Sequence, residues 1–129
     1  MLGLSAEIDL VGRDVVDASV KVHRAMEPGL LESVYEECMA YELSVNRGVK
    51  VERQVELPIL YDGVKLRNQL RLDMVVEGCV ILELKAVERI LPLHQAQLIT
   101  YLKLTGLRLG FLLNFNVPLM KNGIKRMVR

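Results

Sequence analysis

Hydrophobic residues in the first third of the chain recur at the spacing of amphipathic helices. One stripe, at steps of three and four residues, predicts a helix that ends at Pro28-Gly29. A second stripe predicts a helix that ends near Asn46-Arg47-Gly48, where Gly48 suits a left-handed cap. The residues of the two stripes are Leu4, Ile8, Val11, Val15, Ala18, Val22 and Ala25, then Leu31, Val34, Tyr35, Cys38, Tyr41 and Val45.

Beyond residue 49 the apolar positions alternate with polar ones, which is typical of β-strands. A first strand has its apolar residues at odd positions up to Tyr61, and Asp62-Gly63 then predicts a tight hairpin turn. A second strand covers about 66–76 and a third about 80–85. The three residues Glu77-Gly78-Cys79 separate these two strands.

The last third of the chain returns to a helix and then to strands. Pro92 suits the first turn of a helix that ends at Gly106. The apolar run over 107–115 fits a strand covered on both faces, and the segment after Pro118 could add an edge strand. Because a helix lies between the third and fourth strands, a parallel crossover is allowed there. We therefore predict an α/β or α+β fold, with a central mixed β-sheet flanked by helices on both faces.

The composition fits one globular domain over residues 1–129. Hydrophobic residues make up 51% of the chain and charged residues 26%, which excludes the disordered and fibrous classes of protein. The 17 basic residues nearly balance the 16 acidic ones. This balance argues against a high-affinity, non-specific DNA binder, so any contact with nucleic acid would depend on a local patch.

The sequence also predicts a cytoplasmic protein without a membrane anchor. No apolar run reaches the length that a membrane span needs. Acidic residues interrupt the N-terminal apolar stretch, which distinguishes it from a secretion signal. Cys38 and Cys79 match neither a zinc pattern nor a disulfide pattern, so we expect free thiols and a reducing compartment.

The second and third predicted strands carry the most informative polar residues. A three-residue loop between them sets Asp73 opposite Glu83, and Arg71 opposite Lys85. A two-residue loop would place Asp73 beside Leu82 and would mix apolar and polar side chains on both faces. We therefore predict that Asp73 and Glu83 are cross-strand neighbours. The same register places on the opposite face Leu70, Leu72, Met74, Val76, Val80, Leu82 and Leu84.

The predicted register brings two carboxylates to within about 5 Å at their β-carbons. Like charges so close repel each other unless a proton or a cation lies between them. A hard divalent cation such as Mg²⁺ binds through one or two carboxylates together with waters and phosphate oxygens. With Lys85 on the same face, the set suits the attack of an activated water on a phosphodiester. The alternative is the solvated face of a surface strand.

The polar residues of these strands also carry a family resemblance. Asp73, followed on the next strand by Glu83-Leu84-Lys85, resembles the PD-(D/E)XK nuclease superfamily. The residues from Gly29 to Tyr35 match the GxxExxY signature of a small family within it. Gln97-Leu98-Ile99-Thr100-Tyr101 is similar to the QxxxY motif of its exonuclease-like branch. The proline that the superfamily places before its aspartate is replaced by leucine in this chain.

The resemblance implies a restriction-endonuclease-like fold and a role for each matching residue. Asp73 and Glu83 would bind Mg²⁺ or Mn²⁺. Lys85 would orient the water or stabilise the charge of the transition state, and Glu32 would be a further metal ligand. The residues that would contact the substrate are Gln97, Tyr101 and Tyr35.

Each of the additional residues also has a plainer interpretation. Glu32 and Tyr35, three positions apart, could be an ordinary pair on one helix face. Gln97 and Tyr101 could simply cover a packing surface. His94 is expected to form a hydrogen bond at the start of its helix, because metal-assisted hydrolysis does not require it as a base.

Together these features predict a metal-dependent nuclease that hydrolyses DNA or RNA, with DNA as the first expectation. The chain has no room for a separate sequence-reading module, so a second copy or a protein partner could supply specificity. One alternative is a non-catalytic module that binds nucleic acid or protein through the same fold. Another is a small-molecule binding or assembly protein whose carboxylates only decorate the surface.

Overall fold

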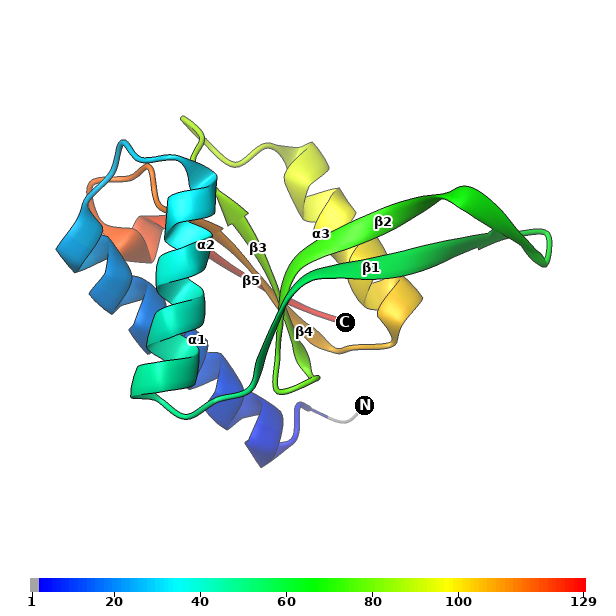
Figure 1. The fold of residues 1–129 in the computed structure, drawn as a ribbon, viewed down its shortest axis with the longest axis horizontal. Coiled ribbons are helices and arrows are strands. Elements are labelled where there is room, and N and C mark those ends of the chain that lie inside the picture. The colour runs from blue at the N-terminus through cyan, green and yellow to red at the C-terminus, as the bar shows by residue number, and fades with distance from the viewer. Residues whose placement is uncertain (1–2) are drawn as a thin grey trace.

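The computed structural model describes residues 3–129, which begin with two helices (Figure 1). Helix α1 (Ala6–Met26) starts at Ser5, whose hydroxyl accepts a hydrogen bond from the Ile8 N–H at 3.2 Å. Helix α2 (Glu32–Tyr41) continues into a short π-helical segment, η1 (Glu42–Asn46). The predicted break between the two helices is confirmed.

Within residues 3–129, five strands form one mixed sheet in the order β1-β2-β3-β4-β5. The β3–β4 pair is parallel, and the β1–β2, β2–β3 and β4–β5 pairs are antiparallel. Helix α3 makes the crossover between the two parallel strands (Figure 1). The bounds are β1 (Val51–Tyr61), β2 (Val64–Val76), β3 (Val80–Lys85), α3 (Pro92–Thr105), β4 (Leu109–Asn114), a 3₁₀ turn η2 (Met120–Gly123) and β5 (Ile124–Val128). The predicted α+β class with a mixed sheet is confirmed.

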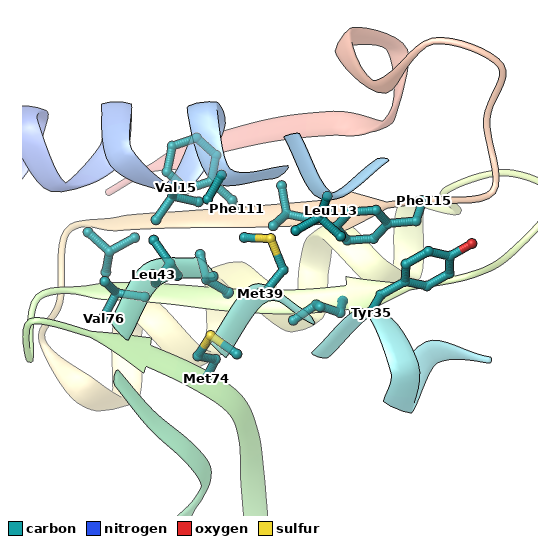
Figure 2. Close-up of a cluster of buried hydrophobic side chains, with 14 of the residues drawn as sticks. Val15, Tyr35, Met39, Leu43, Met74, Val76, Phe111, Leu113 and Phe115 are labelled. Atoms are coloured by element: carbon teal, nitrogen blue, oxygen red, sulfur yellow. The ribbon is translucent and has the colours of Figure 1, made fainter. Parts of the chain in front are cut away.

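Helices cover both faces of the sheet, as the apolar run of β4 requires. Helices α1 and α2 pack on one face, in a cluster that includes Val15, Met39, Phe111 and Leu113 (Figure 2). Helix α3 packs on the other face, where a smaller cluster includes Leu98. The strands β3 and β4 therefore lie between two apolar layers, and Glu83 of β3 is buried there.

The β1–β2 hairpin extends beyond the rest of the sheet as a two-stranded arm (Figure 1). Its turn is at Asp62-Gly63, as predicted, with φ angles of 52° and 76°. The tip exposes apolar side chains, among them Leu60, Tyr61 and Val64. The arm begins on β2 just before Met74, the first residue of β2 that pairs with β3.

The predicted three-residue loop between β2 and β3 is confirmed. The observed pairs are Met74 with Leu82, Val75 with Ile81, and Val76 with Val80. One further step in the same register sets Asp73 against Glu83. The two free cysteines form no disulfide, and no helix within residues 3–129 is long and apolar enough to cross a membrane.

The prediction for Leu70 and Leu72 is wrong. Both leucines pack on the α3 side of the sheet with Ile81, whereas Met74 and Val76 pack on the side of α1 and α2. The residues of β2 therefore change face between positions 72 and 74. Strict alternation along the strand, on which the prediction depended, fails at this point.

The side chains change face because the β1–β2 ladder is interrupted at Gln54 and Asp73, which form no ladder pair. The pairs on either side of the interruption are Arg53 with Met74 and Val55 with Leu72. Gln54 has a φ of 50°, in the left-handed region. This left-handed residue breaks the regular pleat of β1, on which Val51 packs on the side of α1 and α2 and Val55 on the α3 side, so the change of face occurs on both strands.

We predict that Gly110→Ala destabilises the fold. Gly110 lies on β4 under α3, and an added Cβ would lie 2.9 Å from Cδ1 of the buried Leu98. Overpacking of this kind should lower the free energy of unfolding by about 1–3 kcal/mol in urea titrations. Gly3→Ala is the control, because no atom lies within 4 Å of its added Cβ. Equal stability of Gly110→Ala and the wild type would contradict this close packing of α3 on β4.

Candidate active site

Asp73 and Glu83 meet where the pairing of β2 with β3 gives way to side-chain hydrogen bonds. The Leu84 N–H donates to Oδ2 of Asp73 at 2.8 Å. The Asp73 N–H donates to Oε1 of Glu83 at 3.4 Å. Each carboxylate thus accepts a hydrogen bond from a backbone N–H of the opposite strand, and these bonds fix the positions of both carboxylates relative to the sheet.

The carboxyl group of Glu83 has a strongly altered affinity for protons. Only 5% of Glu83 is exposed. Burial, followed by the neighbouring charge of Asp73 and a hydrogen bond between the two side chains, raises the pKa of Glu83 to about 9. Within residues 3–129, neither acid forms a salt bridge with a lysine or an arginine. The pair therefore carries negative charge that the described residues only partly compensate.

Lys85 ends β3 at the edge of this acidic pair. Its positive charge favours the ionised form of Glu83, although burial and Asp73 outweigh it. The backbone that follows Lys85 is fixed by the buried Asn114 on the adjacent strand. The Asn114 side chain accepts from the Val87 N–H at 3.1 Å and donates to the Val87 carbonyl at 2.9 Å. We did not identify Asn114 from the sequence, although a lone amide in an apolar run was the signal available.

Glu32 lies in the first turn of α2, exposed to solvent and near the acidic pair. Partial burial and the charge of Asp73 raise the pKa of Glu32, while Lys85 opposes this shift. Within residues 3–129, no group of three or more acidic, histidine or cysteine side chains is close enough to hold one ion. Glu32 as a third metal ligand therefore stays a prediction.

The prediction that Tyr35 contacts the substrate does not agree with the structure, because the side chain is fully buried. Its ring stacks on Phe115 with centroids 4.6 Å apart (Figure 2). Its hydroxyl donates to the Glu27 carbonyl at 2.6 Å and accepts from the Leu30 N–H at 3.2 Å. Gly29, with a φ of 106°, allows the turn that these bonds close. Tyr35 therefore secures the loop that leads into Glu32.

Helix α3 lines the other side of the site. Burial, then the charges of Glu83 and Asp73, raise the pKa of Tyr101, which is 6% exposed. Gln97 is exposed and lines a groove of about 530 Å³ together with Lys85 and Tyr101. Both predicted α3 residues thus border this groove beside the acidic pair.

His94 has the role predicted for it, since its Nδ1 accepts from the Leu91 N–H at 3.0 Å at the start of α3. This bond satisfies one of the backbone donors that every helix leaves free at its N-terminus. His94 also borders the groove, but its Nδ1 is occupied in helix capping.

The donor set fits a hard divalent cation. Asp73 and Glu83 supply carboxylate oxygens, the ligands that Mg²⁺ and Mn²⁺ prefer. Mg²⁺ needs only one or two carboxylates, because waters and substrate oxygens complete its coordination. Burial, and then the facing charge of Asp73, raises the pKa of Glu83, so a second negative charge is unfavourable at this place. A divalent ion there would replace the shared proton.

A sequence model of the PD-(D/E)XK nuclease superfamily matches residues 9–127. No curated protein and no solved structure shows a significant match to the chain. Because the family match spans nearly the whole sequence and includes both acids, the chain belongs to the PD-(D/E)XK nuclease superfamily.

We predict that Tyr35→Phe lowers the free energy of unfolding by about 1–3 kcal/mol. The substitution leaves the Glu27 carbonyl and the Leu30 N–H without their buried partner. Urea unfolding measures the loss, and Tyr41→Phe serves as the matched control because Tyr41 is 60% exposed. If both variants were as stable as the wild type, the hydroxyl of Tyr35 would not secure the loop.

The metal-free protein should lose stability as the pH rises from about 5 to about 9. The pKa of Glu83 is raised from its ordinary 4.5 to about 9 on folding, so the folded chain holds an extra proton in this window. That advantage is complete at low pH and disappears as the pH rises through the folded pKa. Urea unfolding with a chelator measures the slope, which Glu83→Gln should flatten because an amide does not titrate. An unchanged slope in the variant would contradict the assignment to Glu83.

Proposed function

We propose that this chain, as a member of the PD-(D/E)XK nuclease superfamily, is a divalent-metal-dependent nuclease that hydrolyses phosphodiester bonds. The observation that carries the proposal is the buried carboxyl group of Glu83 facing Asp73, with Lys85 beside them. A module that only binds a partner has no need of a buried glutamate that faces a second acid. The non-catalytic alternative is therefore the weaker one.

Asp73 and Glu83 would hold Mg²⁺ or Mn²⁺ in this proposal, with Glu32 as a further ligand or as a partner for a metal-bound water. When bound, the ion would supply Lewis acidity and lower the pKa of a water molecule. Lys85 lies at the rim of the acidic pair, where an ammonium group stabilises negative charge that develops on the phosphoryl oxygens. The side chain of Asn114, through its hydrogen bonds to the Val87 backbone, holds the chain that follows β3 in place.

The groove along α3 is the proposed path of the nucleic-acid backbone. Gln97 offers an amide that can donate to a phosphate, and Tyr101 borders the same groove. We propose DNA as the substrate on the basis of the superfamily. The motif from Gly29 to Tyr35 supports placement in the GxxExxY family. A cytoplasmic location and a second copy or partner that supplies specificity complete the proposal.

The test compares cleavage of labelled single- and double-stranded DNA and RNA with Mn²⁺ or Mg²⁺. Asp73→Asn and Glu83→Gln should abolish the rise in Tm that Mn²⁺ produces and should lower activity by orders of magnitude. Lys85→Ala should keep the rise in Tm yet lose about 10²–10³-fold in kcat, because its charge acts mainly in the transition state. Gln97→Ala should mainly raise KM.

Lys103→Ala is the matched control for Lys85→Ala, because Lys103 is an exposed lysine of α3 away from the groove. It should retain full activity. The nuclease proposal fails if no nucleic acid is cut with any divalent metal, or if Lys85→Ala cuts as fast as the wild type.

A further inference from the structure

A kink in β1 lies directly across from Asp73. Gln54 has a φ of 50°, which non-glycine residues rarely adopt. The ladder pair that Gln54 would form with Asp73 is absent, although the pairs on both sides are present. The change of face along β2 occurs at the same place. The kink is therefore placed to set the orientation of the Asp73 side chain relative to β3.

The carboxylate of Glu36, one helical turn beyond Glu32 on α2, holds this kink. Oε2 of Glu36 accepts from Nε of Arg53 at 3.0 Å and lies 3.0 Å from Nη2 of the same guanidinium. Oε1 accepts from Nε2 of Gln54 at 2.6 Å. Glu36 is 8% exposed, so its charge is nearly buried and its main described partners are these two residues of β1.

The two partners are consecutive strand residues, whose side chains would point to opposite faces in a regular strand. Both can reach one carboxylate because the left-handed Gln54 interrupts the alternation. The left-handed conformation is unfavourable for a residue with a side chain. Charge-assisted hydrogen bonds to a buried carboxylate are strong enough to offset that cost. The Glu36 contacts and the kink therefore depend on each other.

We propose that Glu36 is a positioning residue, which holds β1 in its kinked form and thereby directs the Asp73 carboxylate toward Glu83 and the metal. Without Glu36, Gln54 would relax toward the extended conformation and pair with Asp73. The hydrogen bond from the Leu84 N–H to Asp73 would then weaken. The part of this inference that concerns the metal rests on the proposed function, whereas the part that concerns Asp73 does not.

The first experiment needs no metal. Amide hydrogen exchange of Leu84 reports the hydrogen bond to Asp73, which is 2.8 Å long in the structure. In the chelated protein, Glu36→Ala should speed this exchange about tenfold or more, because a bond to a charged acceptor is lost. Glu36→Gln keeps one oxygen for Gln54 and should cause a smaller change in the same direction, which also covers a poorly folded Glu36→Ala.

Glu42→Ala is the matched control. Glu42 is another buried glutamate, 6% exposed, whose carboxylate binds Asn46 at 2.7 Å and Lys21 at 3.2 Å. Its removal should lower Tm as Glu36→Ala does, but it should leave the Leu84 amide protected. If the Leu84 amide exchanges at the wild-type rate in both Glu36 variants, or equally fast in Glu42→Ala, the positioning role is wrong.

The second experiment measures Mn²⁺ binding by calorimetry below the Tm of every variant. Glu36→Ala should raise the Kd for Mn²⁺ about tenfold, and Glu42→Ala should leave it unchanged. A wild-type protein that binds no Mn²⁺ would overturn the proposed function and leave the Leu84 result to decide the role of Glu36. A wild type that binds Mn²⁺ together with an unchanged Kd in Glu36→Ala would overturn the positioning of the metal ligand alone.

Discussion

The contact between the Asp73 and Glu83 carboxylates is the interaction on which the arrangement of the site depends. Two acids that face each other in a buried place are costly, and the cost appears as the pKa of Glu83 near 9. The sheet accommodates them because each carboxylate accepts a backbone N–H of the opposite strand. Two backbone N–H groups, one on β2 and one on β3, thus hold the carboxylates in place.

The segment from Gly29 to Tyr35 contains residues that hold a turn and one residue that lies near the acidic pair. Gly29 supplies a left-handed turn, and the buried Tyr35 closes that turn with both hydrogen bonds of its hydroxyl. Glu32, between them, stays exposed at the start of α2 and faces the acidic pair. A sequence signature can therefore contain a residue, such as Tyr35, whose contacts hold a loop at the edge of the site.

Hydrophobic periodicity predicted the elements, the three-residue loop and the meeting of Asp73 with Glu83, because each of these follows from local patterning. It could not predict that Leu72 changes face. That change depends on a contact between Glu36 on α2 and Gln54 on β1, which are distant in the sequence. The burial of Tyr35 was likewise hidden, because a tyrosine at helical spacing fits a core position and a binding position equally well.

Electrostatics connects metal binding with substrate binding in the proposed nuclease. The chain has a net charge of +1, yet Glu32 and Glu83 both interact electrostatically with Asp73 as well as with Lys85. Without a cation, the negative charge of this site repels a phosphodiester and disfavours the binding of a polyanion in the groove beside α3. A divalent ion held by Asp73 and Glu83 would neutralise the local negative charge and would compensate the burial of Glu83 and its repulsion by Asp73. In the proposed nuclease, an ion held by Asp73 and Glu83 would therefore favour entry of the substrate into the groove, in addition to supplying Lewis acidity.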